Sequence, residues 1–343
     1  MTKITCPSVT KGSAVVATAA LMLVGAACSS PGSDPGSGSS TDSGGGAASR
    51  QYTVTFVPGV TPNPFFDTIY RGMKEEATKV NIKVDYQGPP NFDAGAQTTV
   101  LNSVLTSHPD FLIVSPDDGS AIRPPVQRFL DAGIPVITVN GRLKDPSGLV
   151  SQITANNVNG GEVAGAQMAK FAGGSGTVAI INIAAGSLSA EQRVQGFQSA
   201  LTKAAPNVTL APVVNAGGNA SASQTAARAL LLAHPDLKGI FGVTEVNAEG
   251  AAAAVKAAGQ GGKISIIAYD GTPAEVQLLK SGDLQSLIVQ DAEKMGRTAI
   301  QYANGYLRGD KSAIQAQLNL ENVLVTTENV DNPDVKAMLY SSG

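Results

Sequence analysis

The chain has 343 residues, of which 43% are hydrophobic and 15% are charged, and its formal net charge is −3. This length and apolar content predict one large or two ordinary globular domains with a substantial core. A weakly acidic chain without a basic run does not fit a protein that binds nucleic acid.

The first fifty residues have the pattern of a secretion signal. Two lysines precede the apolar run 14–27, which is too short to span a bilayer comfortably and ends in small residues before Cys28. This order predicts a signal peptide over residues 1–28. Cys28 is placed as in a bacterial lipobox, where the cysteine becomes the lipid-bearing N-terminus, although Gly25 replaces the usual larger aliphatic residue. The alternative is ordinary cleavage with Cys28 incidental.

Cleavage at this point removes Cys6 and leaves at most one cysteine, so we expect neither a disulfide framework nor a cysteine metal site. Residues 29–50 are rich in Ser, Gly, Pro and Asp and cannot bury a core. We expect them to form a flexible linker. The predicted location is extracytoplasmic, at the outer face of the cell membrane and anchored only through lipidated Cys28.

From residue 51 onward, strand-like runs alternate with helix-like runs. In the first half we predict strands at 52–57, 82–86, 111–114 and 135–139, with helices at 66–80, 96–106 and 125–132. In the second half we predict strands at 177–183, 208–214, 239–243 and 264–269, with helices at 191–204, 223–232 and 248–258. A further apolar run covers 286–290. This alternation predicts α/β domains with parallel sheets that carry helices on both faces.

Three short motifs recur in the two halves at offsets of 124 to 130 residues. They are Arg71-Gly72 with Gln195-Gly196, His108-Pro109-Asp110 with His234-Pro235-Asp236, and Asn140-Gly141 with Asp270-Gly271. A near-constant offset indicates an internal duplication, so the chain is expected to form two similar doubly wound domains.

Ligands of open parallel sheets bind beyond the carboxyl ends of the strands. Clefts between domains are also common sites for small molecules. The polar residues that follow the predicted strands are therefore candidates for a binding site, namely Asn63, Asn140, Thr244, Asp270 and Gln290.

Two adjacent aromatic residues, Phe65 and Phe66, follow Asn63-Pro64 at one of these strand ends. An ordinary helix start would explain the pattern, because Asn caps helices and Pro suits the first turn. Neighbouring helix positions point about 100° apart, so we do not expect both rings in one core. A ring that faces the cleft offers a stacking surface for the apolar face of a sugar. We favour this second interpretation.

The charged candidates also have ordinary explanations. Asp270 could close a turn and cap the following helix, and Arg193 could be a solvated surface residue. A guanidinium and a carboxylate that share a cleft can instead bind a pattern of hydroxyls through charge-assisted hydrogen bonds. The Gln290 amide could both donate to a ligand and accept from it.

Residues for catalysis or metal binding do not come together in the sequence. Both histidines lie in His-Pro-Asp turns, at the sheet end opposite the expected cleft, and no nucleophile elbow is present. The Gly-rich run 173–176 precedes a strand, whereas a phosphate-binding loop follows one. Scattered acids and two distant histidines do not make a metal site. We therefore expect a protein that is not an enzyme and uses no cofactor or metal.

Several of these motifs together resemble the ribose-binding branch of the periplasmic sugar-binding proteins. They are Asn63-Pro64-Phe65-Phe66, the run Pro-Val-Ile-Thr at 135–138, Asp270-Gly271-Thr272-Pro273 and the linking segment 156–161. The resemblance extends from about residue 52 to past residue 290. It implies the type I periplasmic-binding-protein fold, in which a multi-strand hinge joins two domains. The implied N-terminal domain comprises 51–155 and 291–322, and the C-terminal domain comprises 156–290 and 323–343.

The resemblance also implies a ligand site. Asn63, Phe65 and Phe66 would line it from the first domain, and Arg193, Asp270 and Gln290 from the second domain and the hinge. The chain departs from the ribose-type pattern at Asn140-Gly141, where that pattern has an acid followed by Arg, and in 215–219, which lacks an aromatic residue. Thr244-Glu245 replaces Asn-Asp, with Asn247 close by as a substitute. Sites built for particular hydroxyls discriminate strongly, so a pentose, a hexose, a deoxysugar and a polyol all stay open.

These features predict a monomeric solute-binding protein that closes at a hinge around a sugar or polyol. The resemblance implies that an ABC permease with its ATPase accepts the ligand. A receptor that presents its ligand for signalling or chemotaxis is an open alternative. A sugar-processing enzyme would need paired carboxylates, and only Asp270 is expected to face the cleft. A lactose-repressor-type regulator would need an N-terminal DNA-binding motif, where this chain has a signal and linker.

Overall fold

The computed structural model describes residues 50–340. The predicted signal peptide, Cys28 and nearly all of the predicted linker lie outside the described residues. Between residues 50 and 340, none of the helices combines the length and the apolar character needed to cross a membrane.

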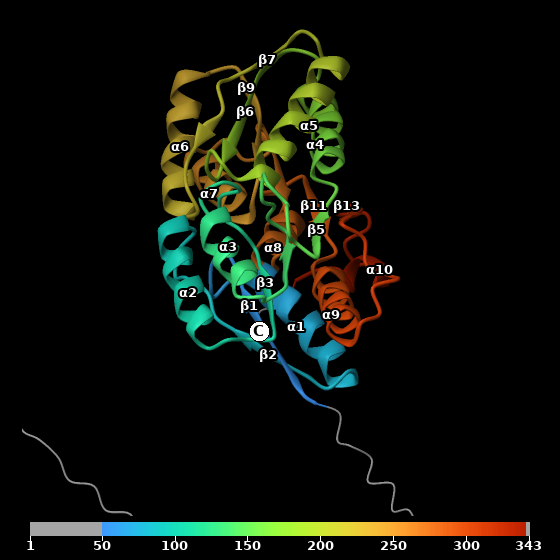
Figure 1. The fold of residues 1–343 in the computed structure, drawn as a ribbon. Helices are drawn as coiled ribbons and strands as arrows, with labels where there is room; N and C mark the ends of the chain where they lie inside the picture. Colours follow the sequence, from blue (N-terminus) through green and yellow to red (C-terminus); the bar gives the residue numbers. More distant parts are fainter. Residues whose placement is uncertain (1–49, 341–343) are drawn as a thin grey trace, which may run out of the picture. The chain divides into compact units, whose positions relative to one another are not determined.

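A six-stranded parallel sheet forms the centre of what we call the first lobe (Figure 1). Its strands are β1 (Tyr52–Val57), β2 (Ile82–Tyr86), β3 (Phe111–Val114), β4 (Val136–Val139), β5 (Ser151–Ala155) and β12 (Gln317–Leu320). They lie in the order β12-β5-β4-β3-β1-β2. The chain order reverses between β1 and β3, which is the kind of position where doubly wound sheets bind ligands.

The second lobe repeats this plan in a second sheet. Its strands are β6 (Gly176–Asn182), β7 (Val208–Leu210), β8 (Val214–Asn215), β9 (Leu237–Gly242), β10 (Ser265–Tyr269), β11 (Ser286–Gln290) and β13 (Asn322–Val325). The order is β13-β11-β10-β9-β6-β7, with β8 also paired to β6, and only β13 runs antiparallel to its neighbour. Both sheets therefore share one strand order, and the predicted doubly wound α/β fold is confirmed.

Helices cover both faces of each sheet (Figure 1). In the first lobe, α1 and α9 pack together on one face, and α2 and α3 pack on the other. In the second lobe, α4 pairs with α5 and α6 pairs with α7, while α8 contacts β11. The helices are α1 (Pro64–Lys79), α2 (Ala94–Thr106), α3 (Arg123–Asp131), α4 (Asn157–Ala172), α5 (Leu188–Ala204), α6 (Ala220–Ala233), α7 (Glu245–Ala257), α8 (Pro273–Ser281), α9 (Ala292–Arg308) and α10 (Pro333–Lys336).

The sequence of β3 shows why helices are needed on both faces. Its four residues are all apolar and fully buried. Phe111 and Ile113 point into the core that contains residues of α1 and α9, whereas Leu112 and Val114 point into the core beneath α2 and α3. Successive side chains of a strand face opposite sides, so a continuous apolar run requires cover on each side.

The chain passes between the sheets three times, from β5 to α4, from β11 to α9 and from β12 to β13. Two of these crossings are joined by the side chain of Asn322. Its Nδ2 donates to the carbonyl oxygen of Asn156 at 2.8 Å, and its Oδ1 accepts from the Tyr269 hydroxyl at 3.0 Å. The backbone N–H of Asn156 in turn donates to Leu320 O at 2.7 Å. These hydrogen bonds thus connect the crossing from β5 to α4 with the crossing from β12 to β13.

Glycines allow the main helix pair of each lobe to pack backbone against backbone. A Cβ on Gly296 of α9 would overlap the Ile69 carbonyl of α1, and a Cβ on Gly72 would overlap the Glu293 carbonyl. In the second lobe, Gly161 of α4 and Gly196 of α5 face the opposite helix in the same way. The repeated Gly72 and Gly196 motifs of the sequence therefore mark one duplicated helix contact.

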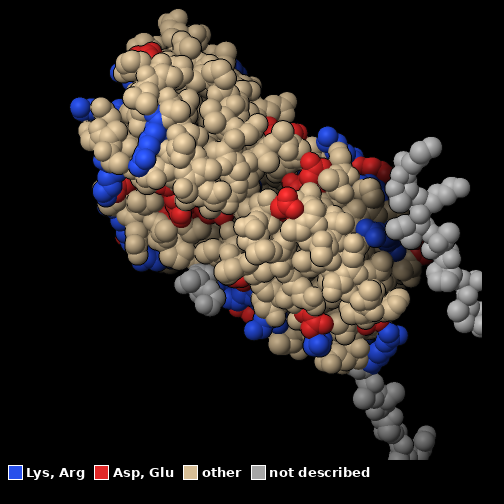
Figure 2. All heavy atoms as spheres, turned by 90° about the vertical axis from the view of Figure 1, so that its left-hand side faces the viewer, with Lys and Arg blue, Asp and Glu red and all other residues tan. Residues whose placement is uncertain are grey.

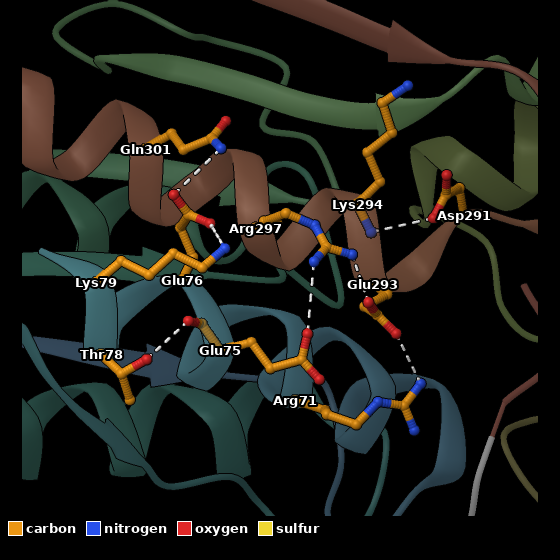
Figure 3. Close-up of polar contacts among 10 residues, drawn as sticks. All are labelled: Arg71, Glu75, Glu76, Thr78, Lys79, Asp291, Glu293, Lys294, Arg297 and Gln301. Atoms are coloured by element: carbon orange, nitrogen blue, oxygen red, sulfur yellow. Dashed lines mark hydrogen bonds and ion pairs between the residues drawn. The ribbon is translucent and has the colours of Figure 1, made fainter. Parts of the chain in front are cut away.

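Charged side chains surround the contact between α1 and α9 (Figure 3). Glu293 of α9 pairs with Arg71 of α1 at 3.0 Å and also with Arg297, which reaches Glu75 of α1 at 3.4 Å. Glu76 accepts hydrogen bonds from both Lys79 and Gln301. Partly exposed ion pairs of this kind contribute little stability, so we attribute the pairing of the two helices mainly to their close packing at glycine.

One predicted strand is divided in the structure. The prediction of a single strand over 208–214 is wrong, because β7 and β8 are separated by Ala211-Pro212-Val213. Pro212 has no backbone N–H to donate to a neighbouring strand, so it interrupts the ladder.

Candidate functional site

A cavity of about 280 Å³ lies between the carboxyl ends of the two sheets and is lined by residues of both lobes. This volume is at the small end of the range for ligand sites. Eight of the nine predicted ligand-binding residues line it, namely Asn63, Phe65, Phe66, Asn140, Arg193, Thr244, Asp270 and Gln290. The duplication explains the convergence, because each lobe contributes its own strand ends.

The ninth residue, Asn247, does not line the cavity. It is fully buried behind the wall, where its Oδ1 accepts from Thr244 Oγ1 at 2.9 Å. Its Nδ2 donates to Ser223 Oγ at 2.9 Å and to Gly217 O at 3.3 Å. Asn247 therefore positions Thr244 and the loop at Gly217, both of which line the cavity.

Arg193 extends from α5 to the cavity wall and is only 4% exposed, so the surface interpretation is wrong. Its guanidinium carbon lies 3.6 Å from the centre of the Tyr269 ring. Nε donates to Asn157 Oδ1 at 2.9 Å, and Nη1 donates to Val243 O at 2.8 Å. Stacking and two hydrogen bonds fix a planar guanidinium in one orientation, as bidentate recognition of a ligand requires.

Asp270 follows β10 and is held by side chains from the end of β11 and from the C-terminal segment. Its Oδ1 accepts from Gln290 Nε2 at 2.6 Å and from the Tyr340 hydroxyl at 2.9 Å. The backbone φ angle is 100° at Asp270 and 58° at Asn140, which follows β4 in the first lobe. Positive φ costs energy for residues other than glycine and is common at ligand sites. The duplicated motifs thus place one strained polar residue on each side of the cavity.

Asn63 caps α1, as the ordinary helix-start interpretation expected, and the same side chain also contacts the other lobe. Its Oδ1 accepts from the backbone N–H groups of Phe65 and Phe66. Its Nδ2 donates to Glu245 Oε1 of the second lobe at 2.7 Å. A second direct link between the lobes is the hydrogen bond from Ser189 Oγ to Asn140 O at 2.7 Å. The cleft is therefore closed over the cavity.

Both phenylalanines line the cavity and both are buried, at 4% and 2% exposure for Phe65 and Phe66. The expectation that the two rings would not share one core is wrong, because they belong to the same apolar cluster. The Phe65 ring centre lies 5.3 Å from that of Tyr340, and the Phe66 ring packs near Phe56 and Phe92. The core of the first lobe thus continues into the cavity wall.

Several cavity residues were missed by the sequence reasoning. Phe92 of the first lobe reaches the second lobe at Gly218, where an added Cβ would lie 2.6 Å from the ring. The ring comes from a loop that no strand-end rule identifies. The acids were missed as well, so the expectation that only Asp270 faces the cleft is wrong. The additional cavity-lining carboxylates are Asp93, Asp117, Asp118 and Glu245.

Two of these carboxyls have raised pKa values. Burial raises the pKa of Asp117 to about 8, opposed by a backbone hydrogen bond from Asp93 and reinforced by the Asp93 charge. Burial, with the charge of Asp270, raises the pKa of Glu245 to about 7. Burial also raises the pKa of Asp270, and Arg193 opposes the rise. In residues 50–340, no group of three or more His, Cys, Asp or Glu side chains is placed to hold a metal ion.

The raised pKa of Asp117 predicts how stability depends on pH. A carboxyl with a raised folded-state pKa stabilises the fold below its unfolded pKa near 4, and this contribution is lost as the pH rises toward 8. We expect the unfolding free energy of the ligand-free protein to fall between pH 5 and 8, by at most about 1.4 kcal/mol per pH unit for this group. Urea unfolding at several pH values measures this change. Over the same pH range, the unfolding free energy of Asp117→Asn should fall less than that of the original protein. Parallel profiles for the two proteins would contradict the assignment.

Two doubly wound lobes that are joined by three chain crossings and enclose a polar cavity are the architecture of the bilobal solute-binding proteins. The family model described as the periplasmic binding protein domain matches residues 54–311. The chain belongs to this family.

Named relatives agree with this assignment and confirm the predicted resemblance. The ribose import binding protein of Salmonella typhimurium is 29% identical over 275 residues, which cover 79% of this chain and 90% of the relative. The D-ribose/D-allose-binding protein of Pseudomonas aeruginosa is 31% identical over 260 residues, which cover 72% of this chain and 79% of the relative.

A solved structure shows the same fold. An ABC transporter solute-binding protein from Agrobacterium vitis, bound with α-D-tagatopyranose, superposes with a TM-score of 0.82 at 29% identity. The match covers 85% of this chain and all of that protein.

Proposed function

We propose that this protein captures a small polyhydroxylated ligand, a sugar or a polyol, outside the cytoplasm and delivers it to an ABC permease. The observation that carries the proposal is the convergence of Arg193, Asp270 and Gln290 with Phe65 and Phe66 on one closed interdomain cavity. Charged and amide groups suit ligand hydroxyls, and aromatic rings suit the apolar face of a sugar. The names of the relatives, which are binding proteins for ribose and allose, support the same class of ligand.

In the proposed mechanism, the ligand enters an open form and then holds the lobes together. The direct contacts between Asn63 and Glu245, and between Ser189 and Asn140, form only when the cleft closes. A ligand that touches both lobes binds the closed form more tightly and therefore shifts the population toward it. The hinge at Asn156 and Asn322 absorbs the rotation. The permease accepts the ligand from this closed form.

Attachment to the membrane completes the proposal. Lipidated Cys28 would keep the protein at the outer face of the membrane, and residues 29–50 would let the lobes reach the permease. A monomer suffices for this role, because a single chain supplies both walls of the cavity.

Calorimetry with a sugar panel tests the proposal. We expect at least one of D-ribose, D-allose, D-tagatose, D-arabinose, D-fucose, D-glucosamine or xylitol to bind with a Kd in the micromolar range or below and to raise the melting temperature. Asp270→Asn should weaken that binding by at least tenfold, because it removes a charged acceptor from the cavity. Asp131→Asn, on the exposed part of α3, is the control and should bind normally. Failure of every compound to bind would refute the proposal.

A further inference from the structure

The cavity carries a large excess of negative groups. Among residues 50–340, five carboxylates and a single cationic side chain, Arg193, contribute to its lining. On the face drawn in Figure 2, acidic atoms border the hollow near the centre of the molecule. The carboxylates are Asp93, Asp117, Asp118, Glu245 and Asp270. An opposite charge nearby stabilises the ionised form of a buried carboxyl, so a cationic group of a ligand would be favoured beside these side chains.

All five carboxylates accept at least one hydrogen bond from the protein, and in Asp117 the donor is the backbone of Asp93. Asp93 and Asp118 cap the starts of helical turns through backbone N–H groups. Glu245 accepts from Asn63, and Asp270 accepts from Gln290 and Tyr340. Asp117 differs, because its Oδ2 atom is buried and has no hydrogen-bond partner within residues 50–340.

Arg193 does not form an ion pair with Asp117. Its Nε and Nη1 are used by Asn157 and by the Val243 carbonyl. The structure shows no ion pair within 4 Å between Arg193 and any cavity carboxylate of the described chain. The charge of Arg193 acts on Asp270, where it opposes the rise in pKa. The groups that act on the pKa of Asp117 are the backbone and the carboxylate of Asp93.

Two further acceptors in the lining lack a partner. The Oε1 atom of Gln290 and the Oδ1 atom of Asn140 are buried and accept no hydrogen bond from residues 50–340. Gln290 is only 1% exposed, so little solvent reaches its side chain. Buried acceptors in native proteins are almost always satisfied. Together with Asp117 Oδ2, these two acceptor atoms favour a ligand that carries several hydrogen-bond donors.

We propose that the ligand carries a positively charged amino group that binds Asp117, so that it is an amino sugar or an amino polyol. This inference rests on the proposed function and narrows its ligand class. An ammonium group donates three hydrogen bonds and brings the missing positive charge, whereas a hydroxyl donates one hydrogen bond and brings no charge. Sugar acids and sugar phosphates would add negative charge, so we expect them not to bind.

Matched pairs of ligands test the inference by calorimetry on the folded protein at pH 7.5. The probes are D-glucosamine, D-galactosamine and D-mannosamine, each compared with D-glucose, D-galactose or D-mannose and with the neutral N-acetyl derivative. We expect at least one amino sugar to bind at least tenfold more tightly than its neutral parent. Asp117→Asn, which keeps the shape and an acceptor oxygen, should reduce this preference to less than threefold. Asp131→Asn makes the same change of net charge outside the cavity and should preserve it.

The possible outcomes separate this inference from the proposed function. If neutral sugars bind and every amino sugar binds equally or more weakly, the amino-group inference is overturned while the sugar-binding proposal stands. A preference for an amino sugar that survives Asp117→Asn would overturn the assignment to Asp117. Absence of binding by both series and by the sugar panel would overturn both proposals together.

Discussion

Replacing Arg193 with alanine is expected to weaken ligand binding by about a hundredfold or more. The guanidinium is buried at the cavity wall, stacked on Tyr269 and oriented by Asn157 and the Val243 carbonyl. Truncating a buried, hydrogen-bonded charge at a binding interface costs about 2–5 kcal/mol. About 2.8 kcal/mol corresponds to a hundredfold change in affinity. Calorimetry with the tightest ligand of the sugar panel measures the effect.

Two controls separate binding from folding. Asn157→Ala removes one support of the guanidinium but keeps the charge, so it should lower affinity less than Arg193→Ala does. Arg193→Lys keeps the charge but loses the planar fork, and we expect it to bind almost as poorly as the alanine variant. Melting temperatures without ligand report any damage to the fold. An affinity within threefold of the original in a folded Arg193→Ala protein would show that Arg193 does not contact the ligand.

Replacing Gly296 with valine is expected to lower the unfolding free energy by about 3 kcal/mol or more. A Cβ at this position of α9 would overlap the Ile69 carbonyl of α1, and neither backbone can move without separating the helices. Overpacking a close contact commonly costs about 1–3 kcal/mol, and backbone overlap is a severe case. Urea unfolding monitored by circular dichroism measures the change.

The matched control for this substitution is Gly261→Val, where an added Cβ has no neighbour within 4 Å. We expect that variant to unfold at nearly the same urea concentration as the original protein. Because α1 also carries Phe65 and Phe66, the Gly296→Val protein should lose ligand affinity together with stability. Equal urea midpoints for Gly296→Val and Gly261→Val would mean that α1 and α9 tolerate a wider spacing.

Strands with apolar residues at every position or at alternate positions could be predicted from the sequence. The predicted strands at 52–57, 82–86 and 111–114 agree with β1, β2 and β3, and the apolar run at 286–290 forms β11. Where a polar residue caps a helix, the helix begins before its first periodic apolar residue, so its start was predicted too late. The helix α2, which Asp93 caps, is an example. Strand β5 was not predicted, because its five buried residues Ser151–Ala155 include Ser, Gln and Thr and form no apolar run.

The candidate site was predictable to the extent that it follows strand ends. Asn140, Thr244, Asp270 and Gln290 each stand at the end of a strand, and all four line the cavity. Asp117 follows β3 at a similar place and could have been found by the same rule. Phe92 could not, because its position depends on how the two lobes meet. The burial of Asn247 depends on Gly217 and Ser223, which are distant in sequence.

The three crossings of the hinge have a consequence for the synthesis of the chain. The first lobe is discontinuous, because α9 covers one of its faces and β12 forms one of its edges. A nascent chain that has reached Gln290 holds every strand of the second sheet except β13, yet the first sheet still lacks β12, and one of its faces is covered by α1 without α9. The lobe that begins first on the ribosome is therefore not complete before the inserted lobe is almost finished.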